Sequence, residues 1–478
     1  MDKKELLSQI ESQHSIFTAL SDKIWDTPEL SLKEHQSMAA YVELLTKLGF
    51  TVETGLAGVE TAFSGSYGSG KPVIGFLGEF DALSGLSQKS GVTHKEALAS
   101  GGCGHGCGHN LLGAGALAAA NAVKEYLAEK GEGSGTVIFY GCPGEEGNAG
   151  KAFMAQKELF SHLDAAVTWH GSDVNEVVTG SCLASYQLLY QFSGTAAHAA
   201  GCPQMGRSAL DAMELMNVGV QFLREHIGPH DGLHYAILDN GGASPNVVQP
   251  TASVLYMLRS DNVPNIRRLA ERVHKVAQGA AMMTETEVSW KFIDGTADVL
   301  PNATLEKLAY ENFAATELPT YSEEEFAFAA ALRKTYTVEQ LPGFATEFDS
   351  EIEDFVREKS GNGSKVINDF LVPYYHSRMI SAGSSDVGDV SHQTPTVQVH
   401  TVTLPAGTPG HSWQTVSAGK SSIAHKGLLL ATKVMAATAF DLFEQPEVLA
   451  AAKAEFEKVN RHGYVCPIEE GTIPTPVE

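Results

Sequence analysis

A short glycine-rich run, HGCGHN, places His105, Cys107 and His109 at alternating positions of the chain. Imidazole nitrogen and thiolate sulfur are the donor atoms that zinc-like divalent cations accept, and glycine lets the backbone fold tightly around such an ion. Because Cys103 lies just upstream, the run could close a four-ligand structural zinc knot by itself. The alternative is that the run supplies part of a larger metal site, whose other ligands lie elsewhere in the chain.

The chain offers acidic and imidazole partners for such a site. Glu145 and Glu146 are adjacent in PGEEG, His170 ends the apolar run AAVTWHG, and His411 lies in GTPGHSW. A divalent metal ion polarises a carbonyl group and lowers the pKa of water to near ~7, while a carboxylate beside it carries the proton to the leaving amine. Since adjacent glutamates point apart, one can bind metal while the other faces the water. These residues predict metal-dependent hydrolysis of an amide bond.

Buried strands are expected to bring these residues together. The apolar runs PVIGFLGEF, GTVIFYGC and AAVTWHG are typical of strands covered on both faces, and they alternate with helical patterns. In an α/β domain, functional residues gather beyond the carboxyl ends of the strands. Asp81, Glu145, Glu146 and His170 all fall at such ends.

A different pattern begins near residue 187, where the order of elements becomes strand, helix, strand, strand, helix, strand. This order is typical of a ferredoxin-like α+β unit. Material of the first kind then resumes with VQVHTVTLP and the helical run SSIAHKGLLLATKVMAATAFDLF. At 478 residues the chain exceeds what one hydrophobic core organises. We therefore predict an α/β protein of two domains, with a mixed-sheet domain over residues 1–186 and 299–478 and an inserted domain over 187–298.

Composition limits the partners and the location of the protein. Fifty-seven acidic and 33 basic side chains give a formal charge of -24, which argues against nucleic acid and against an anionic membrane. The amino-terminal 20 residues carry charge throughout and lack the apolar core of a secretory signal, so we expect a cytoplasmic protein. Six scattered cysteines are too few for a disulfide scaffold. An acidic, helix-prone segment near residues 315–365 is expected to be an insertion to which the sequence gives no role.

These motifs together resemble the aminoacylase and carboxypeptidase family of metal-dependent amidohydrolases. Within that family the chain is similar to the enzymes that cleave p-aminobenzoyl-glutamate. The segments that carry the resemblance span nearly the whole chain: GEFDALSGLSQ, GHGCGHNLLG, FYGCPGEEG, GRSALDA, GGASPNVVQ, SSDVGDVS, GTPGHSWQ and SSIAHKG.

The resemblance implies a metallopeptidase type of catalytic domain with two divalent ions, either zinc or manganese, and an inserted domain that serves as a lid or for dimerisation. Glu145 would act as general base and acid, and Asp81 would orient a metal-binding side chain through a hydrogen bond. Cys103 and His105 would then lie outside the ligand set, which disfavours the zinc knot. The implied metal ligands are Cys107, His109, Glu146, His170 and His411.

Two positions depart from the pattern of many relatives, which carry aspartate where this chain has Glu79 and Asn110. The contacts around the metal ligands are therefore open at these two positions. The sequence also leaves open which ligand Asp81 supports and whether Cys107 binds one ion or bridges two.

The inserted domain carries a second group of candidates. In similar proteins such residues bind the free carboxylate of the substrate and the scissile carbonyl, some of them across a dimer. Guanidinium groups match a carboxylate in bidentate geometry, and an imidazole or amide can donate to a developing oxyanion. A surface or interdomain salt bridge is the alternative for the two arginines. The candidates are His198, Arg207, Asn246 and Arg259.

The function that follows is hydrolysis of an N-acyl amino acid with a free carboxylate, with p-aminobenzoyl-glutamate as the expected substrate. An indole-acetyl or other N-acyl amino-acid hydrolase, or a dipeptidase, is the alternative of the same class. A partner subunit that completes a neighbour's site is the alternative of another class, and the full set of candidate ligands favours a catalytic chain. We expect a homodimer, or a heterodimer with a related subunit, through the inserted domain.

Overall fold

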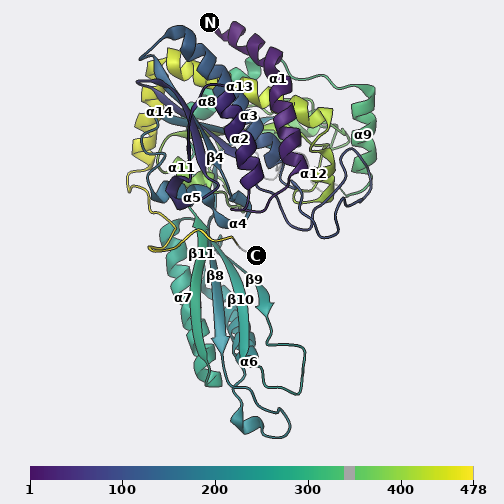
Figure 1. The fold of residues 1–478 in the computed structure, drawn as a ribbon, viewed down its shortest axis with the longest axis vertical. Coiled ribbons are helices and arrows are strands. Elements are labelled where there is room, and N and C mark those ends of the chain that lie inside the picture. Colours follow the sequence, from purple (N-terminus) through teal and green to yellow (C-terminus); the bar gives the residue numbers. More distant parts are fainter. Residues whose placement is uncertain (338–349, 477–478) are drawn as a thin grey trace.

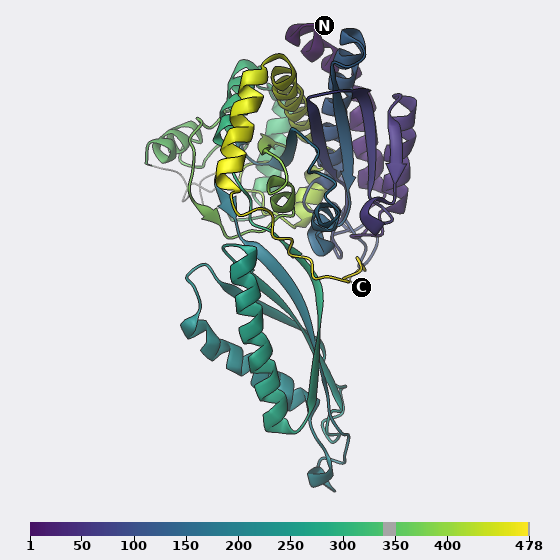
Figure 2. The same ribbon diagram turned by 90° about the vertical axis from the view of Figure 1, so that its left-hand side faces the viewer.

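The computed structural model describes residues 1–337 and 350–476. Its elements form two bodies joined end to end, an upper one around a seven-stranded sheet and a lower one around a four-stranded sheet (Figures 1 and 2). The chain passes from the first body to the second and returns to the first, so the second is an insertion (Figure 1).

The seven-stranded sheet is mixed and has the order β1-β2-β4-β3-β5-β13-β6. Neighbouring strands among β4, β3, β5 and β13 are parallel, and the three outer pairs are antiparallel. Every residue of β3 is buried, as its continuous apolar run predicts. The strands are β1 (Thr51–Thr54), β2 (Phe63–Ser69), β3 (Val73–Glu79), β4 (Gly135–Cys142), β5 (Ala165–Ser172), β6 (Glu176–Val177) and β13 (Thr396–Val402).

Helices α1, α3 and α13 (Ser422–Glu444) pack with this sheet in one large apolar core. The small residues of α3 allow a close approach, since a Cβ atom on Gly115 would lie 2.9 Å from the Trp169 ring of β5. On the other face, Leu77 and Tyr140 of the sheet pack with Phe153 of α5. The helices of this body before the insertion are α1 (Lys3–Asp26), α2 (His35–Lys47), α3 (His109–Lys130), α4 (Glu145–Asn148) and α5 (Gly150–Gln156).

The inserted body has one antiparallel sheet of order β11-β8-β10-β9, with helices α6 and α7 on one face (Figure 2). The sequence order β8-α6-β9-β10-α7-β11 is the predicted ferredoxin-like unit, which is confirmed together with the α/β class of the first body. The elements are β8 (Ala184–Ser193), α6 (Ala209–Leu223), β9 (Gly232–Asp239), β10 (Thr251–Ser260), α7 (Val263–Thr284) and β11 (Glu287–Thr296).

The acidic segment near residues 315–365 contains two helices, and residues 338–349 within it lie outside the described residues. In the described part of the chain, no helix combines the length and the apolar character that crossing a membrane requires. The remaining elements are η1 (Leu56–Gly58), β7 (Ser181–Cys182), η2 (Pro203–Met205), η3 (Arg224–His226), α8 (Ala303–Ala315), α9 (Glu323–Arg333), α10 (Ser350–Lys359), β12 (Ile380–Ser381), α11 (Val387–Ser391), α12 (Trp413–Ala418), α13 (Ser422–Glu444) and α14 (Pro446–Val459).

Candidate metal centre

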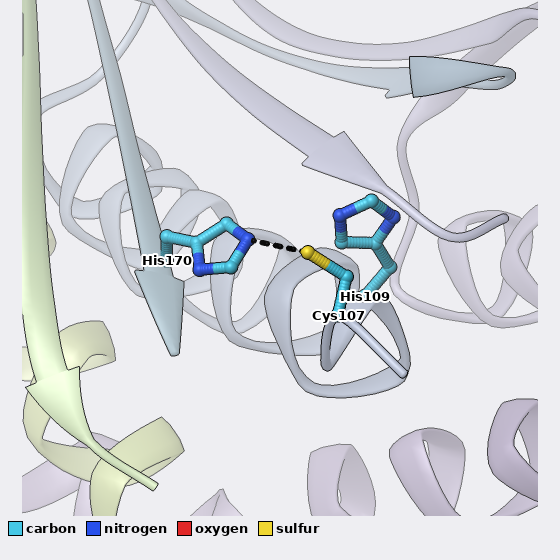
Figure 3. A group of neighbouring side chains, drawn as sticks. All are labelled: Cys107, His109 and His170. Atoms are coloured by element: carbon cyan, nitrogen blue, oxygen red, sulfur yellow. Dashed lines mark hydrogen bonds between the residues drawn. The ribbon is translucent and has the colours of Figure 1, made fainter. Parts of the chain in front are cut away.

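The candidate ligands converge at the carboxyl ends of the parallel strands. His170 lies near the end of β5, Glu146 is in the short helix α4 that follows β4, and His109 begins α3. Figure 3 shows the Cys107 sulfur between the rings of His109 and His170, 3.3 Å from His170 Nε2. His411 reaches the same place from the segment after β13, and its Nε2 lies 3.4 Å from Glu146 Oε2.

Two groups of potential ligand atoms share the sulfur of Cys107. In the first group Cys107 stands with His109 and His170, and in the second with Glu146 and His411. Within each group the ligand atoms lie within 4.8 Å of one another. One sulfur common to two three-ligand groups is the arrangement that a bridging ligand between two ions needs.

Hydrogen bonds fix both imidazoles with one nitrogen toward the ligand group. His109 Nδ1 lies 2.9 Å from Asp81 Oδ1, and His170 Nδ1 lies 2.7 Å from the carbonyl oxygen of Gly171. With Nδ1 as the donor in each ring, the lone pair of Nε2 is left for a metal. Asp81 is therefore the orienting partner of His109, the assignment that the sequence left open.

Asp81 also holds the helix that carries the glutamates. Its second oxygen, Oδ2, accepts hydrogen bonds from the backbone N–H of Glu146 at 2.9 Å and from the Ser31 hydroxyl at 2.8 Å. Burial opposes the charged carboxylate, but these hydrogen bonds and the His109 ring outweigh it and hold the pKa of Asp81 at about 2. One ionised side chain thus sets the positions of His109 and Glu146 together.

The protonation tendencies of the other groups suit a cation between them. Burial lowers the pKa of His170 to about 4, so the ring is neutral near pH 7 and its lone pair is available. Burial raises the pKa of the Cys107 thiol, so a thiolate here requires a positive charge beside it.

Glu145 differs from Glu146 in its surroundings. Burial, followed by the nearby carboxylates of Glu79 and Asp386, raises the pKa of Glu145 well above its ordinary value. Lys151, itself fully buried, lies between those two carboxylates, 2.6 Å from Glu79 and 2.5 Å from Asp386. A raised pKa makes this carboxyl group a better proton acceptor than an ordinary glutamate, which is what a proton carrier requires.

Unpaired buried atoms show that the donor set fits a metal. Among the described residues, His109 Nε2 and Glu146 Oε1 are buried and have no hydrogen-bond partner, an arrangement that costs free energy unless another group satisfies them. Nitrogen, sulfur and carboxylate oxygen together form a set that zinc and manganese accept.

The structural zinc knot is not formed. Cys103 and His105 belong to none of the potential ligand groups found among the described residues. The His105 ring is buried and its Nε2 lies 3.1 Å from the carbonyl oxygen of Ile24. Asn110 points away as well, donating to the Ser21 hydroxyl and the Gly419 carbonyl. By contrast, Glu79 lies beside the centre, with Oε2 3.3 Å from His109 Nε2 but without hydrogen-bond geometry, and it forms a further group of potential ligand atoms with His109 and Glu145.

Comparison with known proteins agrees with this geometry. Residues 75–439 match the model of the peptidase family M20/M25/M40. The chain belongs to this family. It is 42% identical to one of the subunits of p-aminobenzoyl-glutamate hydrolase from Escherichia coli (strain K12), over 98% of each chain. It is 26% identical to the Xaa-Arg dipeptidase of Mus musculus, over 95% of this chain and 92% of that one. The solved structure of the aminobenzoyl-glutamate utilization protein from Klebsiella pneumoniae has the same fold, with a TM-score of 0.57 and 17% identity, over 90% of this chain and 98% of that one.

Membership of the M20/M25/M40 family confirms the family resemblance seen in the sequence. The chain is a metal-dependent amidohydrolase that uses divalent metal ions. The assignment of individual ligands and of the metal stays a proposal.

A cavity of about 740 Å³ lies over the candidate metal centre. Cys107, Glu145, Glu146, His170 and His411 line it, together with residues from the segment before α11 and from β13. The acidic segment that the sequence left without a role reaches this cavity, because Thr337 is also in its wall. The cavity is large enough to hold an amino-acid amide beside the ligands.

The four candidates of the inserted domain do not reach this cavity within one chain. The loops after β8 and between β9 and β10 carry His198, Arg207 and Asn246 at the end of the insertion remote from the seven-stranded sheet (Figure 1). Arg207 makes the surface ion pair that was its alternative interpretation, with Nη2 2.8 Å from Glu285. Arg259 lies on β10 between Ser185 and Gly232, and its Nε is buried without a partner among the described residues.

His198 has a defined hydrogen-bonding state despite its exposure. Its Nδ1 accepts from the backbone N–H groups of Ala200 and Gly201, at 3.2 and 3.1 Å. The proton of the neutral ring is therefore on Nε2, which can donate to a carbonyl oxygen.

Sequence reasoning missed three residues around the centre: Lys151, His400 and Asp386. Lys151 follows the glutamates in GEEGNAGK, and Asp386 is in the motif SSDVGDVS. The sequence contained a signal for Lys151, because a lysine among apolar and small residues comes shortly after the glutamate pair. His400 is directly beside His170 in the register of β13 and β5, and strand pairing is not visible in a single sequence.

Proposed function

We propose that this chain hydrolyses the amide bond of p-aminobenzoyl-glutamate to p-aminobenzoate and glutamate. The observation that carries the proposal is the pair of ligand groups sharing Cys107, with the proton-carrying carboxyl of Glu145 in the same cavity. The full-length similarity to a relative with this activity in its name supports the substrate.

Two divalent ions would be held by Cys107, His109 and His170 on one side and by Cys107, Glu146 and His411 on the other. When bound, such ions polarise the amide carbonyl and make water more acidic. The sulfur and imidazole donors favour zinc over manganese in this site, because both are softer ligands than carboxylate oxygen.

Glu145 is proposed to take a proton from a water molecule while the oxygen of that water attacks the amide carbon. The same carboxyl then gives that proton to the nitrogen of glutamate as the carbon–nitrogen bond breaks, which leaves a carboxylate and an amine. His198 Nε2 would donate a hydrogen bond to the carbonyl oxygen as negative charge develops on it. Asn246 and Arg259 are the proposed partners of the substrate's carboxylates, whereas Arg207 is paired with Glu285.

Replacement of Glu145 tests the proposal. In Glu145→Gln the proton carrier is lost while the ligands stay in place, so we expect kcat to fall at least ~100-fold with metal content per chain near that of wild type. The readouts are turnover of p-aminobenzoyl-glutamate and elemental analysis of the purified protein. Glu132→Gln, in an exposed loop, is the control and should keep full activity. Activity close to wild type in Glu145→Gln would refute the role of this residue.

A panel of substrates separates the alternatives. Preference for an N-acyl glutamate over the matching aspartate and alanine amides supports the proposed substrate. Preference for an indole-acetyl amino acid or a dipeptide would assign the chain to the alternative activities. Stoichiometric metal without turnover until a related subunit is added would support the partner-subunit alternative.

The inserted domain is proposed to join two chains. Its edge strand β9 and the neighbouring helix α6 expose apolar side chains, with Ile237 51%, Leu238 58% and Phe222 71% exposed. An unpaired edge strand with apolar neighbours is suited to pairing with another chain. Such an interface would let His198 of one chain serve the metal centre of its partner. The partner is either a second copy or a related subunit.

A further inference from the structure

A second cavity of about 250 Å³ opens beside the metal cavity and is separate from the proposed metal ligands. The two cavities share five lining residues: Ser384, Ser385, Val387, Gln398 and His400. His400 faces both, and its ring centroid lies 6.1 Å from that of the candidate ligand His170. A group attached to a carbonyl at the metal centre can therefore extend directly into this side cavity.

The walls of the side cavity suit a flat apolar group. Val177, Val178, Val299, Leu300 and Pro301 line it. Its size matches a single aromatic ring, and apolar walls of this kind gain free energy when they remove such a ring from water.

A buried carboxylate forms part of the wall of the side cavity. Glu306 of α8 is 2% exposed, and its Oε2 accepts hydrogen bonds from Thr179 at 3.0 Å, Tyr374 at 3.2 Å and His376 at 2.9 Å. All three hydrogen bonds use the same oxygen, so Oε1 can accept another donor. Burying a carboxylate in an apolar wall is costly, and three partners from distant segments hold it there.

The distance along the cavity suits a para-substituted benzoyl group. Glu176 is opposite His400 in the pairing of β6 with β13, and Thr179, which contacts Glu306, is three residues further along the chain. Because extended chain advances about 3.3 Å per residue, the three steps from Glu176 to Thr179 span at most about 10 Å. This length is comparable to a benzoyl group with its para substituent and one hydrogen bond.

At the entrance, the Ser384 hydroxyl is buried and has no hydrogen-bond partner among the described residues. It lies in the wall common to both cavities. A polar atom at this point can contact the carbonyl end of a substrate whose ring lies further inside.

We propose that the side cavity is the acyl subsite, that it holds an aromatic ring, and that Glu306 selects an amino group in the para position by accepting its hydrogen bond. This inference rests on the proposed function, which places the scissile amide at the metal centre. Glu306 is then a specificity-determining residue, while the metal ligands and Glu145 perform the reaction on any acyl group.

The test compares p-aminobenzoyl-glutamate with p-toluoyl-glutamate, which has a methyl group of the same size in place of the amino group. The measured quantity is the ratio of the two kcat/KM values in wild type, Glu306→Gln and Glu306→Leu. Because both substrates meet the same preparation, this ratio is independent of the folded fraction. The two amides also differ in intrinsic reactivity, but this difference is the same in every variant. It therefore cancels when the ratio in a variant is divided by the ratio in wild type.

We expect the preference for the amino substrate to fall by at least ~10-fold in Glu306→Leu, because this variant loses one hydrogen bond to a charged group. The fall should be smaller in Glu306→Gln, which keeps an acceptor oxygen. Glu311→Gln, an exposed position on the same helix, is the control and should keep the wild-type ratio. An unchanged ratio in both Glu306 variants would overturn the role of Glu306.

A second variant tests the cavity itself. Leu300→Trp places a large side chain in the side cavity and should reduce cleavage of p-aminobenzoyl-glutamate at least ~10-fold relative to N-acetyl-glutamate, whose small acyl group does not need the cavity. Equal loss on both substrates would overturn the subsite. Failure of the wild-type enzyme to cleave any N-acyl glutamate would instead overturn the proposed function itself.

Discussion

Cys107 is the residue on which the two groups of candidate ligands depend, because it is the one member that they share. Its neighbour Cys103 is in the same glycine-rich run and is also partly buried, yet it belongs to neither group. Without this sulfur, His109 and His170 remain in the first group, and Glu146 and His411 in the second, with no ligand in common. The two cysteines therefore form a natural pair for separating a ligand from a bystander.

Removal of the proposed bridging sulfur should change the metal content. We expect Cys107→Ser to lose at least one of two bound ions per chain and to lose activity with it, because a neutral hydroxyl is a poor substitute for thiolate. Cys103→Ser should retain both the metal and the activity of wild type. Elemental analysis after gel filtration gives the ion count. Full metal content in Cys107→Ser would contradict the bridging role.

At the scale of elements, strand β11 leads from the inserted body back to the first body. Its pairing with β8 shifts register between Phe292 and Asp294. The shift leaves Asp294 buried, with a hydrogen bond of 3.1 Å from Gln187. Burial raises the pKa of Asp294 to about 8, and the carboxylate of Asp386 adds to the effect. The strand that connects the two bodies therefore contains an acid that is neutral in the folded protein over most of the physiological pH range.

This acid should make stability depend on pH. Between about pH 4 and 8 the folded state keeps the proton of Asp294 while the unfolded state has released it, so stability falls as pH rises, by at most about 1.4 kcal/mol per pH unit. In Asp294→Asn this contribution is absent, so the variant should gain stability relative to wild type as pH increases from 5 to 8. Thermal unfolding across that range measures the difference, with the exposed Glu214→Gln as control. Parallel curves for wild type and Asp294→Asn would contradict the burial of an acid with a raised pKa.

Elements were more predictable from sequence than the contacts between them. The apolar run of β3 and the strand-helix order of the insertion indicate both sheets, because burial on two faces and period-two alternation leave direct traces in the sequence. The pairing of His400 with His170 leaves no such trace, since nothing in either strand says that β13 lies next to β5. Glu306 was missed for the same reason: its partners Thr179, Tyr374 and His376 come from segments remote in the sequence.

At the scale of the whole molecule, the distance between the candidate metal ligands and the candidate residues of the inserted domain needs an explanation. The candidate metal centre is in the upper body, whereas His198 and Asn246 are in loops at the far end of the insertion (Figure 1). These loops are tied together by a hydrogen bond from the Ala199 N–H to the Asn246 carbonyl at 3.0 Å, so they form one structured tip. Because this tip is remote from the candidate metal centre of its own chain, we expect it to act on a partner chain that binds along the apolar edge of β9 and α6.

Mixing two inactive variants tests this sharing of sites. Glu145→Gln lacks the proton carrier but has an intact tip, and His198→Ala has the opposite defect. If each site combines the metal centre of one chain with the tip of the other, a mixed dimer contains one site with both residues intact. Random exchange of subunits makes half of the dimers mixed, and one site in two is then functional, so activity should recover to about one quarter of wild type. The measurement is the hydrolysis rate after subunit exchange, with each variant alone as control. If His198 instead served its own chain, every mixed dimer would combine defective sites only, and the mixture would stay as inactive as its components.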